Sequence, residues 1–127
     1  MIILSSPFQS DVKASEKNAK IAGVDKAIDF TRQDVEWLDF KVKKSSVDCI
    51  VSNIPCPSQN MAASALKKTY DEIFFQVKHT LDKKGKAVFM GRNLTFLKEC
   101  AKDVKVSKEL QFMNGKETLE VVMFEKK

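Results

Sequence analysis

The sequence predicts an α/β protein in which strands and amphipathic helices alternate around a mostly parallel sheet. Short apolar runs typical of buried strands alternate with helical patterns along the chain, which indicates parallel strands covered by helices on both faces. Near the end of the chain, Asn114-Gly115 separates two strand-like segments, the strongest short hairpin signal. The length of 127 residues, with 43% hydrophobic and 31% charged residues, fits a single domain over residues 1–127.

The first half of the chain is expected to form two strands with a helix between them. In order, the predicted elements are a strand at Ile2–Leu4, a helix at Asp11–Ala22, a strand at Ala27–Thr31 and a helical turn around Val35–Phe40. Pro7 stops the first strand, and Gly23 supplies a left-handed cap after the helix. Trp37 is expected to be a core residue or a docking anchor.

The second half is expected to contain the longest helix and the hairpin. In order, the predicted elements are a strand at Val47–Ser52, a helix from about Met61 to Leu81, a strand at Lys86–Met90, a helix at Leu94–Lys102, and hairpin strands at Glu109–Met113 and Thr118–Phe124. The long helix has apolar side chains at helical spacing, at Leu66, Tyr70, Ile73, Phe74, Val77 and Leu81. Phe112 and Phe124 are expected in the sheet core.

The charge of the chain leaves two interpretations open. The net charge is +5, carried by 22 Lys and Arg residues, and the pI is about 9.1. A nucleic-acid surface needs its cations gathered on one face, whereas lysines spread over a solvated surface need no partner. An RNA-facing surface and an ordinary solvated surface are equally compatible with this charge.

Cysteine and histidine usage narrows the classes of function. The three cysteines, Cys49, Cys56 and Cys100, form no Cys-x-x-Cys pair, so we expect reduced thiols in an intracellular protein. The apolar opening at Ile2–Leu4 is too short for a signal peptide or a spanning helix, so a cytoplasmic protein without membrane contact is expected. His79 is the only histidine, so no metal site and no histidine-dependent nucleophile is expected.

The clearest candidate site follows the strand at Val47–Ser52. The chain continues as Asn53-Ile54-Pro55-Cys56-Pro57, where two prolines prevent further ladder pairing and force a loop. This loop lies at the carboxyl end of a strand, where open α/β sheets bind their ligands.

Three stretches together resemble a known family. They are Ser15-Glu16-Lys17-Asn18-Ala19-Lys20-Ile21-Ala22-Gly23-Val24, Phe30-Thr31-Arg32-Gln33-Asp34 and Asp48-Cys49-Ile50-Val51-Ser52-Asn53-Ile54-Pro55-Cys56. Their order and spacing resemble the class I S-adenosylmethionine-dependent RNA methyltransferases that modify the exocyclic amine of guanine, a group that often carries a THUMP RNA-binding domain. The resemblance implies a Rossmann-like fold, an RNA substrate such as tRNA, and S-adenosylmethionine as cofactor.

The resemblance also implies roles for residues of the loop. In the family's Asn-Pro-Pro-aromatic loop, the Asn side-chain oxygen and a neighbouring main-chain carbonyl accept the hydrogens of the target amine, and the aromatic ring stacks on the base. Asn53 and Pro55 match this pattern, Ile54 replaces the first proline, and Cys56 replaces the ring. Base stacking is then lost, about 1–3 kcal/mol per base, unless Phe8, Tyr70 or another aromatic residue substitutes.

The family's cofactor and RNA contacts are only partly matched. Asp34, followed by Val35, matches the position that contacts the cofactor adenine, although an ordinary strand end or helix cap explains Asp34 equally well. Ser6 falls near the position of the ribose-binding carboxylate, which is missing. Lys67, Lys68 and Arg92 are the candidate contacts to RNA phosphates, with ordinary solvated lysines as the alternative.

The chain departs from the family most at its start. The first strand and the glycine-rich turn of the family should precede Met1, so weak or absent cofactor binding by this chain alone is expected. The strands at Ile2–Leu4 and Cys49–Val51 then either pair with each other or receive a strand from a partner chain, for which a second copy is one candidate.

Two alternatives to amine methylation therefore stay open. One is a non-catalytic, truncated methylase-like module that binds RNA or a protein partner. The other is attack on a pyrimidine ring by the Cys56 thiolate, against which a cysteine simply packed under the loop is the plainer explanation.

Overall fold

The computed structural model describes residues 2–59 and 62–127 and contains two compact units, Met1–Leu38 and Asp39–Lys127. The first unit contains β1 (Ile2–Ser6), α1 (Gln9–Ala22), the 3-10 turn η1 (Asp25–Ala27), β2 (Ile28–Arg32) and the 3-10 turn η2 (Val35–Trp37). β1 and β2 are parallel, and their register runs from Ile2 opposite Ile28 to Ser6 opposite Arg32.

The helix α1 joins the two strands of this unit. Its buried side chains are Val12 and Ala19, seven positions apart and therefore on one helical face. Gly23 follows with φ 76°, the left-handed conformation that glycine adopts without steric cost, and its backbone N–H donates to the carbonyls of Ala19 and Lys20. The predicted helix and its glycine cap are both present.

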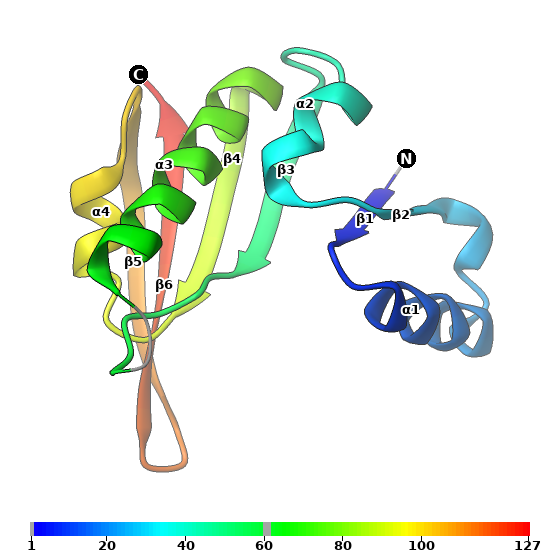
Figure 1. Cartoon of the computed structure of the whole chain (residues 1–127), viewed down its shortest axis with the longest axis horizontal. Helices are drawn as coiled ribbons and strands as arrows, with labels where there is room; N and C mark the ends of the chain where they lie inside the picture. Colours follow the sequence, from blue (N-terminus) through cyan, green and yellow to red (C-terminus); the bar gives the residue numbers. More distant parts are fainter. Residues whose placement is uncertain (1, 60–61) are drawn as a thin grey trace. The chain divides into compact units, whose positions relative to one another are not determined.

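The second unit contains a four-stranded mixed sheet. After α2 (Leu38–Lys41), its elements are β3 (Val47–Asn53), α3 (Ala63–Thr80), β4 (Leu81–Gly91), α4 (Thr95–Cys100), β5 (Val104–Asn114) and β6 (Glu117–Lys126). The strand order is β3-β4-β6-β5, with β3 parallel to β4 and the other two pairs antiparallel. Figure 1 shows α3 and α4 together on one face of this sheet.

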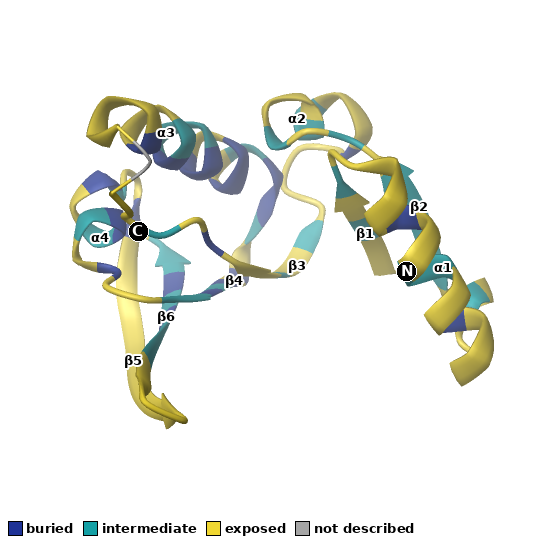
Figure 2. Cartoon of the chain, turned by 60° about the horizontal axis from the view of Figure 1, so that its bottom comes forward, coloured by how far each residue is buried: buried dark blue, intermediate teal, exposed yellow. Residues whose placement is uncertain are grey.

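The core of the second unit lies between α3 and this sheet face (Figure 2). The ring of Phe74 on α3 meets Phe89 of β4 and Phe124 of β6 edge to face, at centroid distances of 6.3 and 5.2 Å. All three side chains are buried, as the helical spacing of α3 and the predicted sheet position of Phe124 require. The long helix and its apolar face are therefore predicted correctly, while the expected start at Met61 lies outside the described residues.

The other face of the four-stranded sheet is open within this unit. Cross-strand partners share a face, so the register separates the buried Ala87, Phe89, Val122 and Phe124 from a second apolar set. This open face consists of Val51, Val88, Met90, Leu110, Phe112, Leu119, Val121 and Met123. The side chains of Val51 and Leu110 are 74% and 57% exposed, so the expected helical cover on both faces is not present within this unit.

Several local expectations need correction. Phe112 is exposed, because it pairs with Leu119 on the open face. Trp37 is exposed and is therefore not a core residue of its unit, while its role as a docking anchor stays a prediction. The hairpin loop is Gly115-Lys116, one position later than predicted, since Asn114 still pairs with Glu117 and Gly115 takes φ 65°.

Each of the two units has its own sheet. Among the described residues, β1 pairs only with β2, and β3 pairs only with β4. Direct pairing of the Ile2–Leu4 and Cys49–Val51 strands across the two units stays a prediction. Completion by a partner chain stays a prediction.

Candidate functional site

The loop after β3 is anchored at Ile54. Its backbone N–H donates to the carbonyl of Met90 at 2.9 Å, which extends the β3–β4 pairing one residue beyond Asn53. The Ile54 side chain is buried, whereas Asn53 is exposed. The Asn53 side chain forms no hydrogen bond with any described residue, so its amide is available to a ligand at the carboxyl end of β3.

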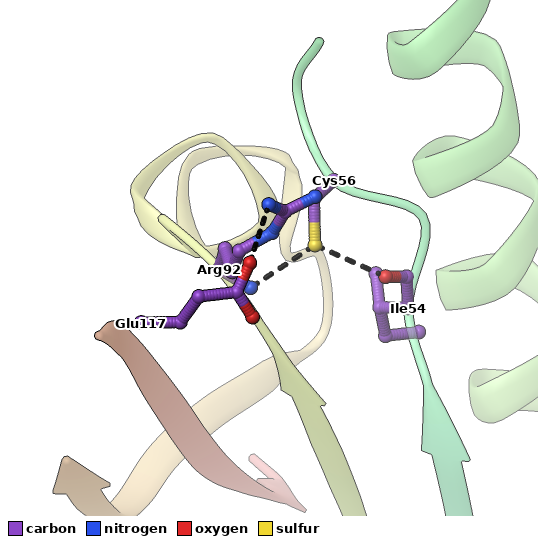
Figure 3. Close-up of polar contacts among 4 residues, drawn as sticks. All are labelled: Ile54, Cys56, Arg92 and Glu117. Atoms are coloured by element: carbon purple, nitrogen blue, oxygen red, sulfur yellow. Dashed lines mark hydrogen bonds and ion pairs between the residues drawn. The ribbon is translucent and has the colours of Figure 1, made fainter. Parts of the chain in front are cut away.

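Cys56 holds the loop against the end of β4 (Figure 3). Its thiol donates to the Ile54 carbonyl at 3.2 Å, and its Sγ accepts the backbone N–H of Arg92 at 3.0 Å. A Cβ on Gly91 would lie 2.8 Å from this Sγ, so a larger residue at this position would force the sulfur or the backbone to shift. These contacts support the packing interpretation of Cys56 over the nucleophilic one.

Tyr70 of α3 holds the same loop from the other side. Its hydroxyl donates to the Pro55 carbonyl, and its ring packs edge to face on Phe96. Burial, with smaller contributions from Cys56 and Cys100, raises the pKa of Tyr70 to about 12. Tyr70 is fully buried and therefore cannot supply the missing base-stacking ring.

A second group of predicted residues lies at the carboxyl ends of β1 and β2. The Ser6 carbonyl accepts the Gln33 backbone N–H at 2.9 Å, so Ser6 and the adjacent Asp34 are brought to one edge. Asp34 begins η2 through its backbone, but its exposed carboxylate caps no N–H and forms no contact with a described residue. The half-buried Val35 follows it as the first residue of η2.

Sequence reasoning missed Asp11. The end of β1 has no carboxylate of its own, but Asp11 in the first turn of α1 accepts a hydrogen bond from the Ser6 hydroxyl at 3.2 Å. The only available signal was its place in the first helical turn, where acidic residues favour the helix dipole. This edge therefore has two exposed carboxylates, those of Asp11 and Asp34.

The residues present fit S-adenosylmethionine only in part. Exposed carboxylates beside parallel strand ends suit the hydroxyl and amine donors of a nucleoside. The four glycines, however, stand alone at positions 23, 85, 91 and 115, and two of them, Gly23 and Gly115, form a helix cap and a hairpin loop. The sequence therefore contains no glycine-rich turn of the kind that holds the methionine end of the cofactor.

Two of the three predicted RNA contacts are neutralised. Lys67 binds Asp71 at 2.6 Å, and Arg92 binds Glu117 at 3.1 Å, as Figure 3 shows for the second pair. The hydrogen bond between Lys67 and Asp71 raises the pKa of Lys67 and lowers that of Asp71. Lys68 is exposed and forms no ion pair with a described residue.

The fold is that of the Rossmann-like class I methyltransferases. TrmN from Thermus thermophilus superposes with a TM-score of 0.85 at 18% identity, over 98% of this chain and 36% of that one. SMU.472, complexed with SAH, gives 0.79 at 18% identity over 99% and 32%. The tRNA methyltransferase TrmK from B. subtilis gives 0.73 at 14% identity over 98% and 49%. These likenesses define a methyltransferase domain fold.

The sequence itself identifies the family. Residues 5–122 match the model of the RMKL-like methyltransferase domain, so the chain belongs to this family. It spans about a third of the length of TrmN and of SMU.472. No curated protein matches it, and no helix of the described residues is long and apolar enough to cross a membrane.

Proposed function

We propose that this domain takes part in S-adenosylmethionine-dependent methylation of a guanine exocyclic amine in cytoplasmic tRNA. The observation that carries the proposal is Asn53, an exposed amide without an internal partner at the carboxyl end of β3, followed by an anchored Ile-Pro corner. An amide oxygen next to an anchored corner is placed to accept a hydrogen of an amine and to orient the amine for methyl transfer.

The loop supplies positioning rather than acid-base chemistry. The Asn53 oxygen and the Ile54 carbonyl are the proposed acceptors for the two amine hydrogens. The Ile54 carbonyl already accepts the Cys56 thiol, but a carbonyl oxygen has a second lone pair. Pro55 and Cys56 keep the corner rigid, through the Tyr70 hydroxyl and the Arg92 N–H respectively.

The cofactor's nucleoside end is assigned to the first unit. Asp34 and Val35 are the proposed contacts to the adenine, and Ser6, whose hydroxyl donates to the Asp11 carboxylate, is the proposed contact near the ribose. When bound, S-adenosylmethionine supplies the methyl group. Its methionine end needs a glycine-rich turn from elsewhere, so weak binding to this chain alone is proposed.

Calorimetric titration of S-adenosylmethionine tests the cofactor assignment. Asp34→Ala should abolish the heat of binding, whereas Asp48→Ala, the same change at an exposed carboxylate of β3, should leave it unaltered. A silent titration with the unaltered chain contradicts cofactor binding by this chain. Methyl transfer to a tRNA transcript, lost in Asn53→Ala, tests the amine-binding role.

A second candidate function is a non-catalytic module that binds a protein partner. The observation that favours it is the open apolar face, which adjoins β3, an edge strand of the four-stranded sheet as the described residues form it. A partner segment that adds a strand to β3 and lays the apolar side of an amphipathic helix on Val51 and Val88 satisfies both surfaces. Whether a second copy of the chain is this partner is decided by the molar mass in solution.

A pair of variants on β4 accompanies the measurement of molar mass. Replacing Val88, which faces the open side, with Lys should convert an associated species to a monomer, while Lys86→Ala on the same strand face should not. A monomeric unaltered chain at high concentration contradicts self-association.

A further inference from the structure

Lysine pairs gather at one end of the four-stranded sheet. The sequence has four Lys-Lys pairs, at 43–44, 67–68, 83–84 and 126–127. Three of them adjoin the start of β3, the start of β4 and the end of β6, which lie together because β3 is parallel and β6 antiparallel to β4. Figure 1 shows these three points at the same end of the sheet, opposite the loop after β3.

The central pair, Lys83-Lys84, lies in a bulge of β4. Val47 pairs with Leu81 and Cys49 with Lys86, so residues 82–85 stand opposite the single residue Asp48. Four residues against one force the backbone outward from the ladder. Both lysine side chains are exposed as a result.

The bulge has a fixed shape. The Lys84 backbone N–H donates to the Asp82 carboxylate at 3.2 Å. A Cβ on Gly85 would lie 2.6 Å from the Leu81 side chain and 3.0 Å from the Val47 carbonyl, so only glycine permits this path. The two lysines are therefore held on an ordered backbone rather than on a free loop.

The other lysine pairs are tied to the same place. Lys83, Lys84 and Lys126 line a hollow of about 230 Å³ with Gly85 and Glu125. The segment after Lys43-Lys44 is fixed because the Ser45 backbone N–H donates to the His79 carbonyl at 2.9 Å, just before β4 begins. Lys127 is fixed through its N–H to the Asp103 carbonyl at 3.3 Å.

These lysines differ from two of the three predicted RNA contacts, Lys67 and Arg92, because no carboxylate of the described residues neutralises them. Glu125 is paired with Lys86 at 3.9 Å, and the Asp82 carboxylate accepts a backbone N–H. None of the six lysines of the three pairs forms an ion pair with a described residue. Lys67 and Arg92, by contrast, are each neutralised by a carboxylate.

We propose that this lysine end, formed by Lys43, Lys44, Lys83, Lys84, Lys126 and Lys127, binds the phosphate backbone of RNA. The inference rests on the RNA substrate of the proposed function and assigns where its backbone is held. Lysines contact phosphates as point charges and release counterions, so they supply affinity and steering without reading sequence. Because the lysine end lies opposite the Asn53 loop, the bound RNA must extend along the sheet.

Two double variants with equal charge change test the site. Binding of a fluorescently labelled tRNA transcript to the full chain is followed by anisotropy at about 50 to 200 mM salt. Lys83→Ala with Lys84→Ala should weaken binding at least about tenfold and lower the slope of log K against log salt by about 1.4–1.8. Lys67→Ala with Lys68→Ala is the matched control, and it should change both the affinity and the salt slope by less. Lys68, Lys83 and Lys84 lie exposed on the surface and Lys67 is held only by its ion pair, so both variants should keep the melting temperature of the unaltered chain.

Three results overturn the assignment. They are an unchanged slope in the Lys83/Lys84 variant, an equal or larger loss in the Lys67/Lys68 variant, or displacement of the tRNA by polyglutamate at equal charge concentration, which indicates an acidic protein as the true ligand. Titration of S-adenosylmethionine into the same proteins separates this inference from the proposed activity. If RNA binding depends on Lys83 and Lys84 while the cofactor titration is silent, the assignment of the cofactor's nucleoside end to this chain fails and the lysine end stands.

Discussion

The Sγ of Cys56 accepts the backbone N–H of Arg92 at 3.0 Å, and this contact closes the loop after β3 onto the end of β4. By the resemblance of the loop, Cys56 is predicted to stand where an aromatic ring would face the base. Cys56, a candidate nucleophile in the sequence, therefore has a structural role in holding the loop. What remains exposed to a ligand is Asn53.

The close approach of Cys56 to Gly91 predicts strong coupling between the two positions. Gly91→Ala places a Cβ 2.8 Å from Sγ and should destabilise the fold by about 1–3 kcal/mol through overpacking. Cys56→Ala should cost about 1–2 kcal/mol, because it removes the bond to Arg92 and leaves a small void. The destabilisation of the double variant should be smaller than the sum of the two single destabilisations by at least about 0.5 kcal/mol. Urea unfolding of all four proteins measures the cycle, and strict additivity contradicts the contact.

Tyr70→Phe should destabilise the chain by about 1–3 kcal/mol. The substitution keeps the ring packed on Phe96 but leaves the Pro55 carbonyl without its donor. Phe96→Leu serves as a control for the ring contact alone, since it leaves the hydroxyl in place. Equal stability of the Tyr70 variant and the unaltered chain contradicts the hydrogen bond.

The same tyrosine predicts a loss of stability in alkali. Burial raises its pKa in the folded state to about 12, above the usual value of 10. The folded chain therefore keeps a proton that the unfolded chain releases, so the contribution is complete below about pH 10 and falls as the pH rises from 10 to 12. The difference in stability between the unaltered chain and Tyr70→Phe, measured by melting at each pH, should therefore shrink as the pH rises across this range. A difference that stays constant with pH contradicts the raised pKa of Tyr70.

Asn53 and Ile54 are neighbours with opposite expected effects on stability. Asn53→Ala should shift the free energy of unfolding by no more than about 0.5 kcal/mol, because the side chain is exposed and bonds to no described residue. Ile54→Ala should cost about 2–5 kcal/mol, because its side chain is 7% exposed. Chemical denaturation separates the two, and a large loss in the Asn53 variant shows that this residue is structural.

The order and type of the elements could be predicted because each carries a strong local signal. The helical spacing from Leu66 to Val77 and the glycine after α1 act within a few residues of themselves. Phe112 was placed wrongly because a strand's alternation defines two faces without saying which one helices cover. The predicted start of β4 was late because the bulge at residues 82–85 hides the pairing of Leu81 with Val47.

The loop's position was predictable, but its internal contacts were not. Proline placement marks a strand end, and the resemblance supplied a role for Asn53. The contacts of Cys56 with Arg92 and of Tyr70 with Pro55 join residues 36 and 15 positions apart, which only the tertiary fold brings together. Asp11 was missed for the same reason, since the sequence alone does not place the first turn of α1 beside Ser6.

The three cysteines should differ widely in reactivity toward a thiol reagent. Cys49 is exposed on β3 and should react first, while Cys56 is half-buried, with its sulfur held between Ile54 and Arg92, and should react more slowly. Cys100 is buried, and this burial raises the pKa of its thiol, so little thiolate forms at neutral pH. Cys100 should therefore be labelled only when α4 opens, whereas in denaturant all three thiols should be labelled at similar rates.

Mass spectrometry of partly labelled protein assigns the order in which the cysteines react, and early labelling of Cys100 contradicts the packing of α4 on α3. Cys49→Ser gives the matched control, since it should remove the fastest phase alone.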